Sequence, residues 1–393
     1  MPLRIAMFSD SVFPILNGVS VSIDALVQEL RNQGHSVHLF APRCFGYRDT
    51  DPNTFRFRAV ATPWAPSYPL AYPPFYRQLL RFRRNQYDVV HTHTPFAMGM
   101  VGLRWSESHE IPIVSTYHTL YDRYAHYLRW FPTRYARFRI AKHTNFYYNK
   151  VDHVITPSEA ASKWLRRHSV NTPASVIPTG IRAQTVCNRA ELRHELGFGP
   201  DQRVMLYVGR LAYEKNLGIL IEMAKRVIAT HPNTRLLLVG DGPFRAEATR
   251  LVRGAHIGDR VRFVGLVARS EVDRYYAASD LFVFPSITET QGLVVQEALG
   301  HGLPAVAVAG GGAGASIVNG QNGFVVKNDP GAFSEAVLEI LDDPDLYEEM
   351  SKESVRSVRH LGIPKMTAGV LSAYEQAMGR HTTERQSARL ALL

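Results

Sequence analysis

The sequence predicts an α/β protein of two doubly wound domains, each a parallel sheet covered by helices on both faces. The chain has 393 residues, enough for two domains at roughly 150 residues each. Predicted strands alternate with predicted helices along most of the chain, which is typical of parallel sheets. The alternation stops at 177–182 and then starts again. Two domains therefore follow one another.

The first half begins with a βαβ unit. Arg4–Ser9 is a short apolar strand, Val19–Asn32 has the apolar spacing of a helix that ends at Gly34, and Ser36–Phe40 is the next strand. Further buried strands are predicted at 88–91, 111–117 and 153–156.

In the second half, strands are predicted at 204–208, 235–239, 261–263, 281–284 and 305–308, and helices at 217–229 and from Leu293. We expect a first domain at 1–185 and a second at 186–362. A helix at 363–380 can pack back on the first domain, and 381–393 form a weakly ordered polar tail.

Composition excludes several classes of protein. The residues are 45% hydrophobic and 20% charged, as in globular chains. Met1–Asp10 carry only a short apolar run, and we find no run of about 18 apolar residues, so a secretory signal and a membrane span are not expected. Two cysteines without ligand spacing favour a reducing cytoplasm.

The net charge of +10 is unevenly placed. Residues 1–185 contain 22 Lys and Arg against 11 Asp and Glu, whereas residues 186–393 contain 23 against 24. The whole excess of positive charge lies in the first half, where it can attract an anionic partner.

The loops at the carboxyl ends of the second-half strands are candidates for an anion site. Ligands bind at these ends, and we expect a cleft where the two domains face each other. Arg210 and Lys215 follow one strand, and SITETQGLVVQEAL (286–299) follows another. The backbone amides of 291–294 open a helix and can hold phosphate oxygens, while the two cations neutralise them. The sequence predicts a diphosphate clamp without a metal.

Two carboxylates flank this turn. Glu289 precedes the helix and Glu297 lies about one and a half turns into it, so each can accept hydrogen bonds from hydroxyl groups beside a diphosphate. A nucleotide sugar has this layout. The alternative is that Glu297 only complements the helix dipole.

A set of spaced motifs carries a family resemblance. Glu289-x7-Glu297 followed by ALGHGLP, Gly209-Arg210 with Lys215-Asn216, and VGDGP at 239–243 resemble retaining glycosyltransferase family 4, which has the GT-B fold. The resemblance extends over nearly the whole chain. It implies that Glu297 binds the ribose, that Glu289 contacts the sugar, and that Arg210 and Lys215 hold the diphosphate. The expected donor-binding set is Gly18, Arg210, Lys215, Asp241, Leu266, Glu289, Thr290, Gln291, Gly292, Leu293, Val294 and Glu297.

The first domain contributes two candidates. Gly18, in the loop after the first strand, is either a turn glycine or a point of close approach to the donor. His118 follows a strand and is expected to contact sugar or acceptor. The family's chemistry is front-face attack assisted by the leaving phosphate, so we assign His118 to positioning and electrostatic support. The catalytic set is therefore His118, Glu289, Arg210 and Lys215.

No metal or other cofactor is expected. Asp49-Thr50-Asp51 has the DxD pattern but lacks a phosphate-binding context, and His91 and His93 lack a third ligand nearby in the sequence.

Residues 123–150 favour a membrane surface as partner. They contain seven Lys and Arg, nine aromatic residues and no Asp or Glu, and the RQLLRFRR segment at 77–84 adds a second basic patch. The alternatives are a solvated or core role, or nucleic acid, for which no motif is present. The acceptor or membrane set is Tyr117, Tyr121, Tyr124, Arg129, Trp130, Arg134, Arg137 and Arg139.

A finer resemblance links YHTLYDRYAHY (117–127) and TETQG (288–292) to the diacylglycerol glucosyltransferase branch. That branch implies UDP-glucose as donor, diacylglycerol as lipid acceptor, an α-linked product and a cytoplasmic enzyme held peripherally at the inner face of the cell membrane. Rival hypotheses are GDP-mannose or UDP-galactose as donor with phosphatidylinositol or a soluble acceptor, and a non-catalytic membrane-surface binding protein. A dehydrogenase is disfavoured because no GxGxxG follows the first strand.

Overall fold

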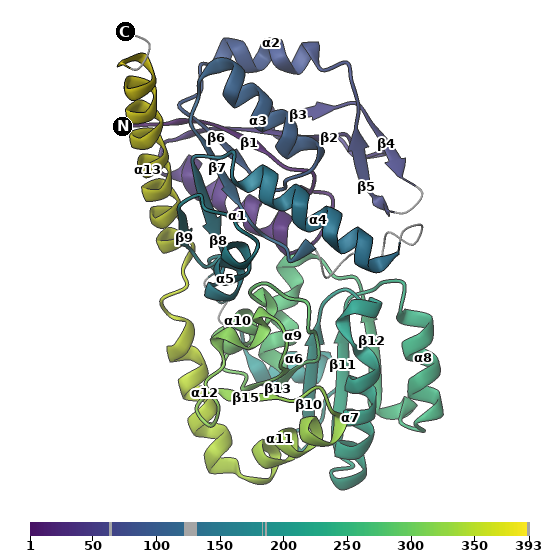
Figure 1. Ribbon diagram of the computed structural model, residues 1–393. Coiled ribbons are helices and arrows are strands. Elements are labelled where there is room, and N and C mark those ends of the chain that lie inside the picture. The colour runs from purple at the N-terminus through teal and green to yellow at the C-terminus, as the bar shows by residue number, and fades with distance from the viewer. Residues whose placement is uncertain (63–64, 122–131, 183, 185–186, 391–393) are drawn as a thin grey trace. The chain divides into compact units, whose positions relative to one another are not determined.

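The chain forms two compact units (Figure 1). Unit 1 comprises Met1–Gly180 and Ile363–Leu393, and unit 2 comprises Ile181–Gly362. The computed structural model describes residues 1–62, 65–121, 132–182, 184 and 187–390, without the side chains of 62, 65–68 and 384–390. Within these ranges, no helix is both long enough and apolar enough to span a membrane.

Unit 1 is built on a seven-stranded sheet in the order β3-β2-β1-β6-β7-β8-β9, and all neighbouring strands are parallel. Its strands are β1 (Arg4–Phe8), β2 (Ser36–Pro42), β3 (Thr54–Phe57), β6 (Val89–Thr92), β7 (Ile113–Thr116), β8 (His153–Thr156) and β9 (Ala174–Val176). Its helices are α1 (Gly18–Asn32), α2 (Tyr76–Asn85), α3 (Ala97–His109), α4 (Thr133–Tyr148), α5 (Glu159–Arg167) and α13 (Ile363–Leu390).

Two apolar clusters lie in unit 1. One contains Phe8, Phe40 and Trp105, whose rings pack within about 6 Å of one another, and the other contains Ile5, Met7 and Val114. Alternate residues of β1 belong to different clusters, because successive side chains of a strand point to opposite faces. This confirms that the first strand is buried on both faces.

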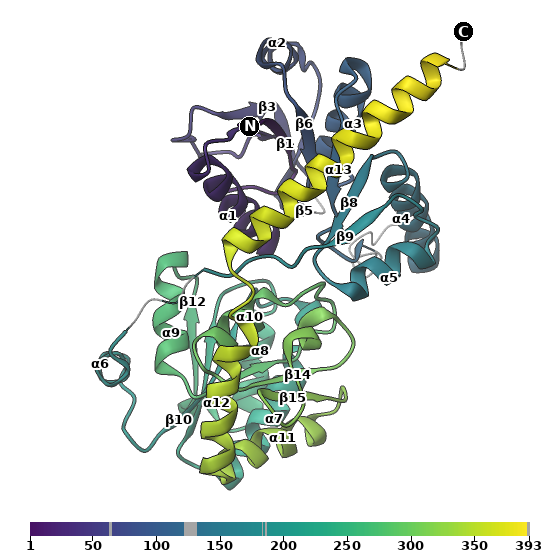
Figure 2. The same ribbon diagram turned by 90° about the vertical axis from the view of Figure 1, so that its left-hand side faces the viewer.

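The last helix of the chain completes unit 1. Met366, Val370, Ala373, Tyr374 and Ala377 recur at helical spacing and are buried in the same cluster as Ile5 and Met7. Helix α13 contacts α1, β7 and β8 (Figure 2).

The helix also corrects one expectation. The sequence predicted a polar tail from His381, whereas α13 continues to Leu390. The sequence from His381 has neither proline nor glycine to end the helix, and it contains several residues that favour helix, such as Glu384, Arg385 and Ala388.

A two-stranded antiparallel ribbon in unit 1 was not predicted. Strands β4 (Ala59–Thr62) and β5 (Ala65–Ala71) pair with Ala59 opposite Ala71. Pro66 and Pro69 obscure the strand pattern in the sequence, but a ribbon of two edge strands tolerates proline.

Unit 2 has a six-stranded parallel sheet in the order β12-β11-β10-β13-β14-β15. Its strands are β10 (Arg203–Val208), β11 (Thr234–Val239), β12 (Val261–Gly265), β13 (Leu281–Phe284), β14 (Ala305–Val308) and β15 (Gly323–Val326). Its α-helices are α6 (Arg189–Glu195), α7 (Leu217–Thr230), α8 (Arg245–Gly254), α9 (Val272–Ala278), α10 (Leu293–Gly300), α11 (Pro330–Asp342) and α12 (Pro344–Val358). Four short 3₁₀ turns complete it: η2 (Tyr213–Lys215), η3 (Gly258–Arg260), η4 (Arg269–Glu271) and η5 (Gly312–Ser316).

Strands β10 to β14 lie where the sequence predicted them, whereas β15 was not predicted. All residues of β13 and β14 are buried, as are the last five of β10, so these strands form the centre of one large core. Polar residues accordingly gather in the loops at the strand ends.

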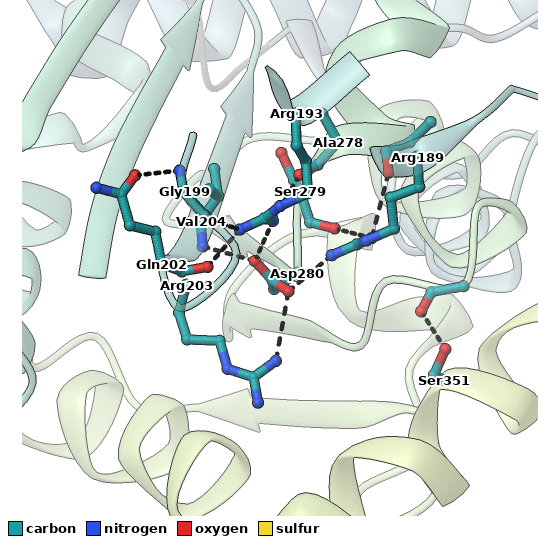
Figure 3. Close-up of polar contacts among 12 residues, drawn as sticks. Arg189, Arg193, Gly199, Gln202, Arg203, Val204, Ala278, Ser279, Asp280 and Ser351 are labelled. Atoms are coloured by element: carbon teal, nitrogen blue, oxygen red, sulfur yellow. Dashed lines mark hydrogen bonds and ion pairs between the residues drawn. The ribbon is translucent and has the colours of Figure 1, made fainter. Parts of the chain in front are cut away.

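An ion cluster centred on the buried Asp280 anchors α6 to this sheet (Figure 3). The side chain of Asp280, 4% exposed, lies 2.7 Å from Arg189, 3.1 Å from Arg193 and 3.5 Å from Arg203. It also accepts a hydrogen bond from the Val204 amide at 2.7 Å. Arg193 in turn donates to three backbone carbonyls, those of Ala278, Gly199 and Gln202.

We expect Asp280→Asn to destabilise unit 2 by about 3 kcal/mol, because the isosteric amide leaves the buried Arg193 without its counter-charge. Denaturant unfolding followed by fluorescence measures this change. The control is Arg250→Gln, which removes an exposed pair with Glu247 and should leave the midpoint unchanged. Equal midpoints for Asp280→Asn and the wild type would contradict the anchoring role.

Candidate functional site

Two loops at the carboxyl ends of β10 and β13 meet in unit 2. Lys215 Nζ forms an ion pair with Glu289 Oε1, and Ser286 Oγ donates to the same oxygen at 3.3 Å. The Asn216 side chain donates to the Pro285 carbonyl at 3.3 Å, which ties the loops together. A cation and a carboxylate from the predicted site therefore lie in contact.

Arg210 is held by a carboxylate that the sequence analysis missed. Its Nη2 lies 2.6 Å from Glu214 Oε1, and the Glu214 side chain is only 2% exposed whereas that of Arg210 is 43% exposed. A buried carboxylate thus orients a half-exposed guanidinium. Glu214 stands four residues after Arg210, so the i,i+4 spacing was the available signal.

The turn before α10 requires glycine. Gly292 has φ 74°, in the left-handed region, and a Cβ there would lie 2.7 Å from Ala313 Cα. The amides that follow open α10, where a helix N-terminus can hold an anion.

A glycine-rich loop after β14 packs against the backbone of the turn before α10, a contact that was not predicted from the sequence. The Gly312 amide donates to the Glu289 carbonyl at 2.6 Å, and a Cβ on Gly312 would lie 2.0 Å from the Thr290 oxygen. The run Gly310–Gly312 directly after a predicted strand was the signal, because consecutive glycines mark close backbone approach.

Gln291 is buried, and its side chain donates to Gln296 Oε1 at 2.8 Å. The Gln291 side chain therefore supports the turn from inside the protein. The first residues of α10, Leu293 and Val294, are partly exposed.

Glu297 is enclosed by groups from η4 and α9. Its Oε1 pairs with Arg269 Nη2, and its Oε2 accepts from Arg269 Nη1 at 3.3 Å and from the Tyr276 hydroxyl at 3.1 Å. Burial raises the pKa of the Glu297 carboxyl, and Arg269 and Tyr276 oppose this rise. Neither partner was predicted, because no sequence spacing connects residue 269 with residue 297.

Asp241 and Leu266 follow β11 and β12, at the same edge of the sheet. Asp241 accepts hydrogen bonds from Arg245 at 2.9 Å and from the Gly242 amide at 2.7 Å. The Leu266 side chain is 75% exposed. An exposed leucine beside the site offers an apolar surface to a flat ring.

Unit 1 places His118 in a histidine cluster. His118 Nε2 lies 3.0 Å from His93 Nδ1, and the ring of His93 packs on that of His91 with centroids 4.1 Å apart. His91 lies 2.7 Å from both the Tyr374 hydroxyl and Thr116 Oγ1. Burial lowers the pKa of His91 to about 3 and that of His118 to about 4. The cluster is therefore neutral at physiological pH.

Gly18 is the exposed first residue of α1. Asn17 forms the N-cap, and its side chain accepts hydrogen bonds from the amides of Val19 and Ser20. This capping agrees with the hypothesis that Gly18 is a turn glycine at the start of the helix. Close approach to a donor stays a prediction.

Tyr117 needs a correction. It is 0% exposed and stacks on Trp164 with centroids 5.5 Å apart, so it cannot contact a membrane. Tyr121 is partly buried against Phe96. Tyr124, Arg129 and Trp130 lie outside the described residues.

Arg134, Arg137 and Arg139 are exposed on α4. Tyr135 and Phe138 are exposed on the same helix, Phe138 by 62%. The basic and aromatic character predicted for this segment is therefore present at the surface of unit 1.

Both carboxylates of the DxD pattern have protein partners. Asp49 pairs with Arg56 at 2.7 Å and Asp51 with Arg31 at 3.0 Å. In the part of the chain that the structure describes, no group of three or more His, Cys, Asp or Glu is arranged to hold a metal ion.

Comparisons with known proteins follow the same division of the chain. The family described as Glycosyltransferase Family 4 matches residues 16–185, and Glycosyl transferases group 1 matches residues 188–356. An alpha-monoglucosyldiacylglycerol synthase of Streptococcus pneumoniae is 33% identical over 78% of this chain and 71% of its own length. The protein of that name in Acholeplasma laidlawii is 30% identical over 91% of this chain and 93% of its own.

Among solved structures, a sucrose-phosphate synthase from Thermosynechococcus elongatus has a TM-score of 0.78 at 26% identity, covering 96% of this chain and all of the other. Two parallel-sheet units of this kind define the GT-B class of glycosyltransferase. The chain belongs to glycosyltransferase family 4 and is an enzyme that transfers a sugar. This finding sets aside the non-catalytic alternative.

The histidine cluster should make unit 1 sensitive to acid. The unfolded chain protonates His91 near pH 6.5, whereas the folded protein does so only near pH 3. Keeping His91 neutral therefore costs the folded state nothing above pH 6.5. As the pH falls from 6.5 towards 3, the free energy of unfolding decreases by about 1.4 kcal/mol per pH unit. We expect His91→Gln to be less stable at pH 7.5 but to lose stability less steeply on acidification. Denaturant unfolding at several pH values measures both slopes, and parallel slopes would contradict the assignment.

Proposed function

We propose that this glycosyltransferase moves glucose from UDP-glucose onto diacylglycerol, with retention of the α configuration, to give a monoglucosyl lipid. One observation carries the donor site: Lys215 and Glu289 lie in contact beside the N-terminus of α10, and the same helix presents Glu297. This arrangement suits a diphosphate with a hydroxyl-bearing group on either side. The names of the two relatives support the sugar and the lipid.

Four charged residues of the proposed donor site then have defined roles. Arg210 and Lys215 neutralise the diphosphate, and the first amides of α10 bind its oxygens. When the phosphate replaces Glu289 as the partner of Lys215, the Glu289 carboxylate is free to accept hydrogen bonds from the sugar hydroxyls. Glu297 accepts those of the ribose.

The reaction exchanges one bond for another at the anomeric carbon. The bond from this carbon to the phosphate oxygen breaks, and the acceptor hydroxyl oxygen attacks on the same face. The hydroxyl proton passes to the departing phosphate. The cations stabilise the charge that develops on that phosphate, a role for which no metal ion is needed.

His118 acts as a neutral hydrogen-bonding group in this proposal. Burial keeps its pKa near 4, so the ring carries no positive charge at physiological pH. His93 orients the ring through the 3.0 Å contact, and a fixed ring can position a hydroxyl without reorganisation.

The lipid acceptor calls for contact with a membrane surface. Helix α4 exposes Arg134, Arg137 and Arg139 beside Tyr135 and Phe138. Such a face gains about 1 kcal/mol per basic residue near anionic lipid, while rings enter the headgroup region. Helix α2 adds a second exposed group of basic and apolar residues, namely Tyr76, Arg77, Leu80, Arg81, Arg83 and Arg84. We propose peripheral binding at the inner face of the cell membrane.

The rival within the same family uses GDP-mannose or UDP-galactose as donor and phosphatidylinositol or a soluble acceptor. The exposed Leu266 contacts a base by its apolar surface, which does not select uracil over guanine.

A donor panel tests the proposal. Labelled sugar is offered as UDP-glucose, UDP-galactose or GDP-mannose, each with EDTA, to diacylglycerol in vesicles with or without anionic lipid. We expect lipid product from UDP-glucose, independent of metal and raised by anionic lipid. Glu289→Gln should lower turnover by about 100-fold or more, since it removes a charged acceptor at the sugar. Lys225→Gln on the exposed face of α7 is the control. Label from another donor, or only in soluble acceptors, would support the rival.

The membrane surface is tested by charge reversal. Replacing Arg134, Arg137 and Arg139 by Glu should weaken binding to anionic vesicles by about 100-fold, from about 1 kcal/mol per residue. Sedimentation with vesicles measures binding. The matched control replaces Lys225, Arg226 and Arg253, which are exposed in unit 2, by Glu. If both triple variants bind alike, only net charge matters and α4 is not the contact.

A further inference from the structure

Groups of the protein itself occupy most of the hydrogen-bond acceptor positions of the Glu297 carboxylate. A carboxylate offers about four acceptor positions. Arg269 Nη2 occupies one on Oε1, and Arg269 Nη1 and the Tyr276 hydroxyl contact Oε2 at 3.3 and 3.1 Å. One position on Oε1 is left. The Arg269 Nη1 contact is the longest of the three and the first that a ligand could replace.

Arg269 is itself enclosed. Its side chain is 21% exposed and that of Glu297 only 12%, so the pair is largely out of water. Arg269 Nε is buried and has no hydrogen-bond partner among the described residues. An unpaired buried donor is costly, and a solvent-exposed arginine would avoid that cost.

The position of Arg269 in the chain brings it beside the donor site. It stands three residues after the exposed Leu266, in the segment that follows β12. Glu297 lies on α10, whose first turn forms the proposed phosphate site. The pair therefore joins the segment near the base to the helix at the phosphates, which is where the ribose of a nucleotide lies.

We propose that Arg269 is a donor-positioning residue, which keeps Glu297 ionised and in one orientation for the two neighbouring hydroxyls of a ribose. It thereby makes the site selective for ribonucleoside over 2′-deoxyribonucleoside diphosphates. The inference rests on the proposed function, because it assumes that Glu297 faces the ribose.

The surrounding charges explain why such a residue is needed. Burial raises the pKa of the Glu297 carboxyl and Asp273 on α9 raises it further, whereas Arg269 and the Tyr276 hydroxyl lower it. His301, after α10, donates from Nδ1 to the main-chain carbonyl of Glu297 at 2.9 Å, and its Nε2 lies 3.9 Å from Asp273 Oδ1. Without Arg269 the carboxyl would stay protonated to higher pH. A protonated carboxyl carries a donor on one oxygen and can no longer accept from both hydroxyls.

Arg269 also complements the ribose directly. When a hydroxyl replaces the 3.3 Å contact, Nη1 can donate to the oxygen of that hydroxyl. Each hydroxyl then donates to Glu297, and one of them accepts from Arg269. A 2′-deoxyribose lacks one of the two hydroxyls and so leaves an acceptor position of Glu297 unpaired. The site should therefore bind ribonucleotides much more tightly than 2′-deoxyribonucleotides.

The experiment measures binding of UDP and 2′-deoxy-UDP by calorimetry to the full chain between about pH 8 and about pH 5.5, and repeats it with GDP and 2′-deoxy-GDP. The proteins are wild type, Arg269→Gln, Arg269→Lys and Glu297→Gln. The matched control is Arg274→Gln on α9, which removes exposed pairs with Glu271 of η4 and Glu195 of α6.

We expect the wild type to prefer the ribonucleotide by about 100-fold, and Arg269→Gln to reduce this ratio to below about 10-fold. Binding to Arg269→Gln should weaken further as the pH falls, because Glu297 becomes protonated, and Arg269→Lys should restore part of the ratio. In turnover, KM for the donor should rise more than kcat falls. Arg274→Gln should behave as wild type. The ratio is measured within each protein, so a partly unfolded variant does not alter it.

Three results would overturn the inference. Equal weakening of the ribo and deoxy ligands by Arg269→Gln would mean that the ion pair only ties η4 to α10. Tighter UDP binding would mean that Arg269 competes with the ribose. An unchanged ribo-to-deoxy ratio in Glu297→Gln would remove the ribose assignment itself, and with it the proposed donor site. The GDP arm separates these results from a wrong choice of base.

Discussion

Burial of parallel strands on both faces is the constraint on which the rest of the molecule depends. In unit 2 the central strands β13 and β14 contribute only buried side chains, so they carry no polar group that could act on a substrate. Along these two strands, charged residues can be accommodated only where the strands end. Because all strands are parallel, their carboxyl ends lie along one edge, and residues from separate loops meet there. Lys215 and Glu289 meet for this reason, although 74 positions separate them.

The same constraint decides what could be predicted from the sequence. Buried strands such as Val204–Val208 and Leu281–Phe284 have continuous apolar runs, and the predicted fold follows from them. Residues directly after such strands, among them Lys215 and Glu289, could be predicted because strand ends determine their place. Arg269 and Tyr276 could not, since their contact with Glu297 depends on how η4 and α9 fold over the sheet. Tyr117 was misplaced because an aromatic residue at a strand end can turn inward as well as outward.

The charges of the site come in balanced pairs. Arg210 pairs with Glu214, Lys215 with Glu289, and Arg269 with Glu297. Such pairing lowers the desolvation free energy of the cations in a partly buried site that holds no ligand. In the proposed function, an incoming diphosphate would therefore exchange ion-pair partners with the protein rather than meet an unpaired charge. The binding energy of that diphosphate would then be smaller than the number of cations suggests, and release of the nucleotide product would be easier.

Helix α13 returns to the sheet in which the chain began. Tyr374 contacts His91 across 283 positions of sequence, and between them lies the whole of unit 2. Unit 2 is thus inserted into unit 1. During synthesis unit 2 emerges complete, whereas the apolar face of β1, β7 and β8 stays open until residues 363–377 leave the ribosome. That face is exposed to wrong partners throughout this interval, which makes unit 1 the part of the protein that would most benefit from a chaperone.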